Sequence, residues 1–127
     1  MARLTASSQD YLEAILKLSE ESPQIRSIDV AERLGVSRAS VSRALRPLKD
    51  AGLIEQKRYS LISITDAGRK AGQEVEERHV ALRHFLSDVL GVNPGVAEVD
   101  ACSMEHSLSL ESLTKLQGFL QNHLNTK

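Results

Sequence analysis

The segment from Ser27 to Ile54 constrains the fold of this chain more than any other part of the sequence. A short helix is expected over residues 28–34, followed by Gly35, which can take the positive φ that a tight turn needs. A second helix is expected to be capped by Ser37 and to run to about residue 51, where Gly52 follows. Two helices joined by a glycine turn in this way predict a helix-turn-helix.

The remaining pattern predicts helices and a single hairpin. Apolar residues recur at helical spacing over residues 8–19, with Ser7 or Ser8 as the expected N-cap. Two short strands are predicted at 53–56 and 61–65, around a polar tip at 57–60. Three further helices are expected, from Thr65-Asp66 to about Leu90, from Asn93-Pro94 through His106, and from about Ser109 to Leu124. The fold class is therefore mainly α with a small β-hairpin wing.

The charge of the chain is unevenly distributed, although its net value is only −1. Residues 24–60 contain eight Lys and Arg against four Asp and Glu. Val41, Leu45 and Leu48 are expected to face the core, which turns a basic face of the second helix outward. A basic face on a helix-turn-helix favours binding to DNA phosphates and base edges, whereas the alternative is a helical hairpin with a solvated basic face. The candidate DNA-binding residues are Arg26, Ser37, Arg38, Ala39, Ser40, Ser42, Arg43, Arg46, Lys49, Lys57 and Arg58.

Pro47 conflicts with a regular recognition helix. Proline lacks a backbone donor and normally kinks a helix interior. We expect a bend, or an early end to the base-reading geometry, after about Arg46.

Several potential metal ligands lie at helical spacing. Asp10 and Glu13 are three residues apart, so their carboxylates share one helix face. Cys102, Glu105 and His106 share a face of a later helix, and the long helix between carries a histidine, His79. Thiolate, imidazole and carboxylate together suit Fe²⁺ or Mn²⁺, with Co²⁺, Ni²⁺ and Zn²⁺ able to substitute. The alternative is that Cys102 and His106 are incidental core residues.

Four stretches resemble one known family. They are SQDYLEAI (8–15), LISITDAG (61–68), Arg78-His79 and CSMEH (102–106). With the helix-turn-helix, they resemble the iron- and manganese-dependent repressors typified by the diphtheria toxin repressor and the manganese transport regulator, in a short form without an SH3-like domain. The resemblance implies a winged helix-turn-helix DNA-binding domain at 1–72 and a helical metal-binding and dimerisation domain at 73–127.

The resemblance also implies how the ligands are grouped. Asp10, Cys102, Glu105 and His106 would form one site, and Glu13 and His79, sharing Glu105, would belong to a second. The match is a hybrid, because Asp10 and Glu13 resemble the manganese branch and Cys102 resembles the iron branch. In its ancillary metal site, the iron branch uses an acid where this chain has Arg83 and a histidine where it has Glu98.

Together with these residues, the resemblance implies a homodimeric, cytoplasmic repressor of metal homeostasis genes that binds a palindromic operator in double-stranded DNA, with Fe²⁺ or Mn²⁺ as corepressor. The alternative is a winged-helix regulator that does not respond to metal. An enzyme is not expected, because the sequence contains no catalytic Ser/His/Asp or Cys/His grouping and no glycine-rich phosphate loop. No organic cofactor is expected, and no apolar run reaches the roughly 18 residues of a membrane helix.

Overall fold

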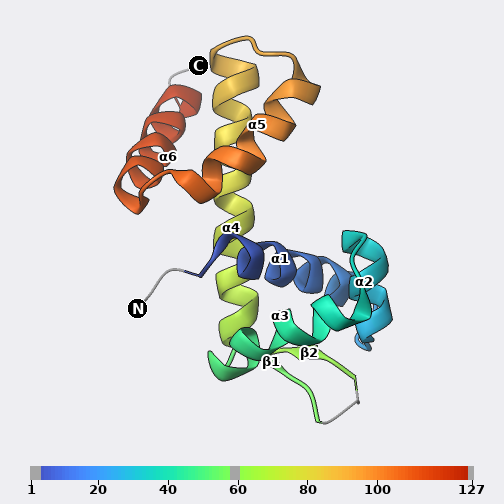
Figure 1. Ribbon diagram of the computed structural model, residues 1–127. Helices are drawn as coiled ribbons and strands as arrows, with labels where there is room; N and C mark the ends of the chain where they lie inside the picture. The colour runs from blue at the N-terminus through green and yellow to red at the C-terminus, as the bar shows by residue number, and fades with distance from the viewer. Residues whose placement is uncertain (1–3, 58–60, 126–127) are drawn as a thin grey trace. The chain divides into compact units, whose positions relative to one another are not determined.

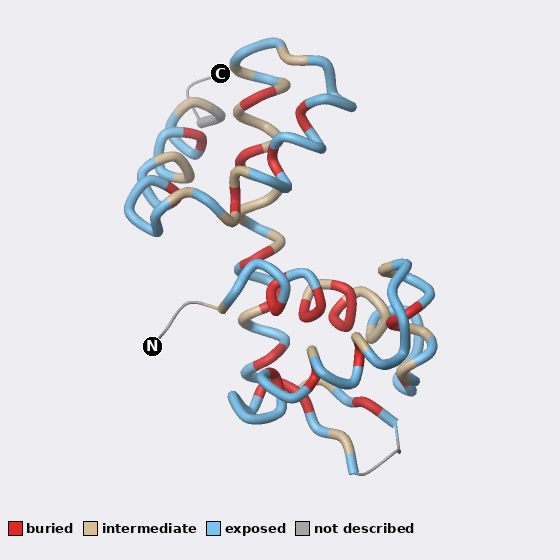
Figure 2. The backbone as a smooth tube through the Cα atoms, in the orientation of Figure 1, coloured by how far each residue is buried: buried red, intermediate tan, exposed pale blue. Residues whose placement is uncertain are grey.

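The computed structural model describes residues 4–57 and 61–125, and the chain divides into two compact units, Met1–Val75 and Glu76–Lys127. Each unit has its own hydrophobic core. Figure 2 shows that buried positions alternate with exposed ones along the helices of both units, as expected of amphipathic helices. The mainly α fold with a small hairpin is confirmed.

Over its described residues, the first unit contains three helices, a two-stranded sheet and the start of a fourth helix (Figure 1). The elements are α1 (Ala6–Glu21), α2 (Ser27–Leu34), α3 (Arg38–Asp50), β1 (Ile54–Glu55), β2 (Ser63–Ile64) and α4 (Asp66–His84). The strands are antiparallel, pairing Ile54 with Ile64 and Glu55 with Ser63. An isolated bridge joins Ile25 to Ile62 and extends the sheet by one residue pair. The strands are shorter than the sequence indicated.

The predicted pair of helices joined by a glycine turn is confirmed, with α2 beginning at Ser27, one residue earlier than expected. Gly35 ends α2 with φ at 67°, and the Ser37 side chain accepts a hydrogen bond from the Ser40 amide at 3.1 Å to cap α3. Three side chains of α3 are buried, and they are the three predicted to face the core: Val41, Leu45 and Leu48. They pack with α1 and with the strands into one apolar cluster. Burial of this face leaves the opposite face of α3 to solvent.

Two helix starts in this unit depend on particular side chains. The N-cap of α1 is Thr5 rather than Ser7 or Ser8, and its hydroxyl accepts from the Ser8 amide at 3.1 Å. At α2, the Asp29 carboxylate accepts from the backbone amide of Arg26 at 2.9 Å. That hydrogen bond holds the pKa of Asp29 below its usual value.

The helix α3 does not end near Arg46. It continues through Pro47 to Asp50, and the Ala51 amide donates to the Pro47 carbonyl at 3.0 Å. Because proline has no backbone N–H, the carbonyl of Arg43, four residues earlier, loses its helical donor. Arg43 and Pro47 are both exposed, so water can hydrate this carbonyl. The predicted extent of this helix to about residue 51 is confirmed, and the expected bend, or early end to the base-reading geometry, after Arg46 stays a prediction.

Thr65 joins the two ends of the hairpin. Its hydroxyl donates to the Gly52 carbonyl at 2.7 Å and accepts from the Gly68 amide at 3.0 Å, while its own amide donates to the Leu53 carbonyl at 3.1 Å. The same residue thus caps α4 and fixes the base of the wing.

The regular elements in the described part of the second unit are all helices. The unit contains the end of α4, a π-helical turn η1 (Phe85–Val89), α5 (Pro94–Ser107) and α6 (Leu110–Asn125). The long helix was expected to stay α-helical to about Leu90, whereas its α-helical part ends at His84. Leu82, Leu86, Ala97, Ala101 and Leu113 form the buried core of the unit. No helix among the described residues is both long enough and apolar enough to span a membrane.

Candidate functional site

The helix α5 presents the predicted Cys102, Glu105 and His106 donors on one side. Asn93 caps this helix through a 2.9 Å bond to the Gly95 amide, and Pro94 occupies its first position, as the sequence indicated. Cys102 is exposed, His106 is half-buried, and a ligand atom of each lies within 4.8 Å of the other. Helical geometry thus brings a thiol and an imidazole to a separation at which one ion can contact both.

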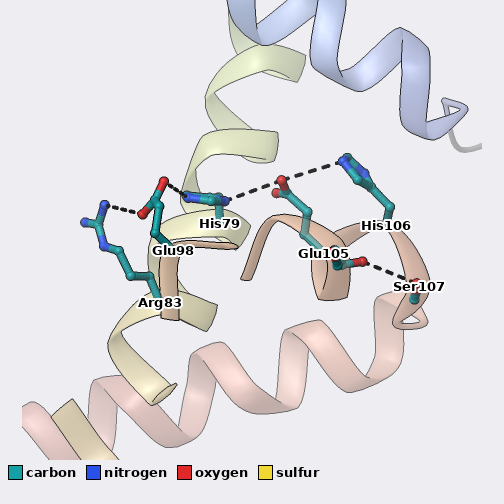
Figure 3. A network of polar contacts seen from close by, with 7 residues as sticks. His79, Arg83, Glu98, Glu105, His106 and Ser107 are labelled. Atoms are coloured by element: carbon teal, nitrogen blue, oxygen red, sulfur yellow. Dashed lines mark hydrogen bonds and ion pairs between the residues drawn. The ribbon is translucent and has the colours of Figure 1, made fainter. Parts of the chain in front are cut away.

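Glu105 lies between two imidazoles (Figure 3). Its Oε1 is 3.5 Å from Nδ1 of His79 on α4 and 3.7 Å from Nε2 of His106. The Glu105 side chain is only 2% exposed. Burial of a carboxylate is costly unless cations or donors surround it, so this position is more typical of a ligand site than of ordinary core packing.

His79 contacts a second carboxylate, which the sequence did not identify as part of a site. Its Nε2 lies 2.8 Å from Oε1 of Glu98, and the other oxygen of Glu98 lies 3.4 Å from Nη1 of Arg83. The hydrogen bond with His79 holds the pKa of Glu98 below its ordinary value, and Arg83 acts in the same direction. Two sequence signals point to it: the iron branch of the resembled family has a histidine at this position, and Glu98 precedes Glu105 by seven residues, which places both on one face of a helix.

The donor set of this second unit fits a borderline divalent ion. One thiol, two imidazoles and a buried carboxylate belong to Cys102, His79, His106 and Glu105, and these are ligand types that Fe²⁺, Mn²⁺ and their neighbours accept. Asp10 and Glu13 belong to the first unit. There Asp10 is exposed and Glu13 is half-buried on α1. Their convergence with the α5 donors stays a prediction from the family resemblance.

The predicted DNA-binding residues gather on the outward face of α3. Five of its polar or basic side chains are exposed, namely Arg38, Ser42, Arg43, Arg46 and Lys49. Ala39 is also exposed, and Ser40 is half-buried beside the Ser37 cap. Four of these side chains, Arg38, Arg43, Arg46 and Lys49, are basic, as contact with a phosphate backbone requires.

Three other predicted DNA contacts lie outside α3. The Arg26 side chain is exposed and forms a 3.5 Å ion pair with Asp29. Lys57 is exposed in the wing, and Arg58 lies outside the described residues.

Two family models match the chain, one in its N-terminal part and one in its C-terminal part. Residues 3–61 match the model of the iron dependent repressor N-terminal DNA binding domain. Residues 65–125 match the model of the iron dependent repressor metal binding and dimerisation domain. Together the two models account for almost the whole chain.

Individual relatives are transcriptional regulators. The chain is 42% identical to the transcriptional regulator MntR of Escherichia coli O6:H1 over 114 residues, which cover 90% of this chain and 73% of that protein. It is 37% identical to the HTH-type transcriptional regulator MntR of Listeria monocytogenes serotype 4a, covering 94% of this chain and 85% of the relative. A solved manganese-dependent transcriptional repressor in complex with manganese superimposes with a TM-score of 0.77 at 30% identity, covering 90% of this chain and 52% of that structure. The chain thus spans about half the length of that solved structure.

Proposed function

Because this chain belongs to the iron-dependent repressor family of metal-dependent transcriptional regulators, we propose that it is a homodimeric repressor whose binding to operator DNA requires Fe²⁺ or Mn²⁺. Residues 1–72 would read DNA, and residues 73–127 would bind metal and dimerise. The observation that carries the proposal is the buried Glu105 carboxylate, which lies between His79 and His106 and one turn from Cys102. A regulator without metal response has no need of such a cluster.

Six residues are proposed to hold the metal: Asp10, Glu13, His79, Cys102, Glu105 and His106. The carboxylates of Asp10 and Glu13 come from the DNA-reading unit, and the other donors come from the dimerisation unit. Brought together, three ionised carboxylates repel one another and disfavour the assembled arrangement. A bound divalent ion supplies the positive charge that offsets this repulsion.

The proposed coupling to DNA is a population shift. Donors contributed by both units can be satisfied together only in arrangements that bring the units to one mutual orientation. In a two-fold symmetric dimer, one orientation sets the spacing of two recognition helices, and helix-turn-helix dimers bind half-sites about one turn of DNA apart. A palindromic operator follows from this symmetry.

The exposed face of α3 supports the DNA-reading part of the proposal. Arg38, Ser40, Ser42 and Arg43 lie in its first two turns, where a recognition helix contacts base edges. Arg46 and Lys49, further along, would contact phosphates, as would Arg26 and the wing residues Lys57 and Arg58.

Exposed apolar side chains of the second unit support dimerisation. Val96 and Val99 on α5 are 51% and 67% exposed, and Leu110 and Phe119 on α6 are about half exposed. An apolar patch of this kind is typical of a protein interface. We propose that these residues contribute to the contact between two copies of the chain.

The proposal is tested by anaerobic titration of the purified chain with Mn²⁺ and with Fe²⁺, read by binding to randomised DNA duplexes and compared with a chelated sample. We expect a palindromic subset of duplexes to bind only with metal. The variant Cys102→Ala should lose this response, whereas Ser103→Ala, an exposed neighbour on the same helix, should keep it. Equal binding with chelator would instead establish a winged-helix regulator that responds to another signal.

A further inference from the structure

Three side chains of the second unit form a continuous chain of polar contacts that ends at a proposed metal ligand (Figure 3). Arg83 Nη1 lies 3.4 Å from Glu98 Oε2, and Glu98 Oε1 lies 2.8 Å from His79 Nε2. Arg83 and His79 are one turn apart on α4, and Glu98 reaches them from α5. Each carboxylate oxygen of Glu98 therefore has its own partner.

The two nitrogens of His79 face different neighbours. Nε2 meets Glu98, whereas Nδ1 lies 3.5 Å from the buried Oε1 of Glu105. A neutral imidazole carries one N–H and one lone pair, and an ionised carboxylate can only accept. For a neutral ring, a hydrogen bond to the ionised Glu98 carboxylate therefore places the proton on Nε2. The lone pair of Nδ1 is then left on the side of Glu105 and the other proposed ligands.

Exposure separates the roles of these residues. The His79 side chain is 12% exposed, whereas those of Glu98 and Arg83 are 52% and 41% exposed. The Arg83 guanidinium, which can only donate, occupies the other oxygen of Glu98, and a carboxylate paired in this way accepts the His79 proton. Glu98 thus contacts His79 from the solvent-exposed side of the proposed ligands.

We propose that Glu98, held by Arg83, is a positioning residue that fixes His79 with its proton on Nε2, so that Nδ1 is available to a divalent metal ion. The inference rests on the proposed function, because it takes His79 as a ligand. Ligating histidines commonly donate their second N–H to a carboxylate, which sets the tautomer and the ring orientation. Both oxygens of Glu98 are already engaged with Arg83 and His79, which argues against Glu98 as a ligand itself.

The tautomer is measured first on the metal-free full chain by nitrogen-15 NMR of the imidazole rings, where the two nitrogens differ according to which one carries the proton. In the wild-type chain, His79 should be protonated on Nε2. Glu98→Ala should give a mixture of tautomers, whereas Glu98→Gln should retain the wild-type form, because an amide oxygen still accepts from Nε2. His79 with the same tautomer in Glu98→Ala as in the wild type would overturn the proposal.

His84 provides a matched control. It also pairs with a carboxylate, since its Nδ1 lies 2.5 Å from Oδ2 of Asp88. Asp88→Ala removes a carboxylate from a histidine in the same unit that is not a proposed ligand. This change should alter the His84 signals and leave those of His79 in place.

Affinity for Mn²⁺ is measured next, by direct titration of the same variants. Glu98→Ala should bind about ten- to a hundred-fold more weakly than the wild type, the usual effect of losing such a partner. Glu98→Gln should stay close to the wild type, as should Asp88→Ala. Equal losses in Glu98→Gln and Glu98→Ala would mark Glu98 as a ligand and overturn the positioning role. A wild-type chain that binds no Mn²⁺ would refute the proposed function, whereas wild-type binding with an unaffected Glu98→Ala would refute only this inference.

Discussion

Replacing Gly68 by alanine tests how α4 packs against the base of the wing. A Cβ at this position would lie 1.9 Å from the Leu53 carbonyl oxygen and 2.9 Å from Cγ1 of Ile64. The Leu53 oxygen also accepts the Thr65 amide at 3.1 Å. The clash is with backbone, so it cannot be relieved by a side-chain rotation. Alanine at 68 must instead move the start of α4 away from the strand.

The expected cost follows from that geometry. Overpacking that side chains can absorb costs about 1–3 kcal/mol. Because backbone must move here, we expect Gly68→Ala to lower the free energy of unfolding by at least about 3 kcal/mol. For a unit of this size, such a loss lowers Tm by roughly 10–25 °C. Gly118→Ala should act in the opposite direction, because its Cβ would meet nothing within 4 Å in the middle of α6, and alanine favours a helix by about 0.5–1 kcal/mol.

The assay is thermal unfolding of the full chain followed by circular dichroism, at one protein concentration, because dimer stability depends on concentration. Amide exchange at Thr65 serves as the local reporter and should accelerate in Gly68→Ala. A Gly68→Ala protein that melts at or above the wild-type temperature would refute this description of the wing base. The Gly118→Ala protein controls for the general effect of replacing glycine with alanine.

Three further predictions concern the surface. Hydrogen bonding lowers the pKa of Asp29 in the folded chain. The ionised Asp29 carboxylate therefore stabilises the fold at pH values above its pKa in the unfolded chain, and this stabilisation is lost as the pH falls through its pKa in the folded chain. The Tm gap between wild type and Asp29→Asn should therefore shrink below about pH 4. Val99→Glu should lower the mass measured by light scattering toward that of a monomer, whereas Ile28→Glu, in the other unit, should not. A Val99→Glu protein that remains dimeric would show that α5 is not part of the interface. Arg43→Ala should weaken operator binding and reduce its salt dependence without changing Mn²⁺ affinity, whereas Arg69→Ala should bind DNA as the wild type does.

Local signals in the sequence were enough to predict the helix-turn-helix. Gly35 needs a left-handed conformation and Ser37 caps the helix that follows, and both requirements are met within a few residues of the chain. The alignment of Cys102 with His106 was equally local, because residues four apart on a helix share a face. Predictions of this kind depend only on helical geometry.

Features that depend on contacts between elements were missed. Glu98 meets His79 across two helices and 19 residues, a pairing that no spacing rule reveals. The π-helical turn after His84 is likewise invisible to apolar periodicity, which continues across it. At Pro47 the helix continues to Asp50, because α3 is held by its buried face on both sides of the proline, at Leu45 and Leu48. Tertiary packing outweighed the local cost of the missing donor.

The hydrogen bonds of Thr65 hold the two ends of the hairpin together at its base. They join Gly52, Leu53 and the start of α4, so the two ends of the segment between them stay together whatever its length. Doubling the length of a segment with fixed ends costs only about 0.6 kcal/mol. A change of length between the two strands should therefore leave the contacts of Thr65 with Gly52, Leu53 and Gly68 in place. The reach of the wing is a property that evolution or protein engineering can vary independently of α3.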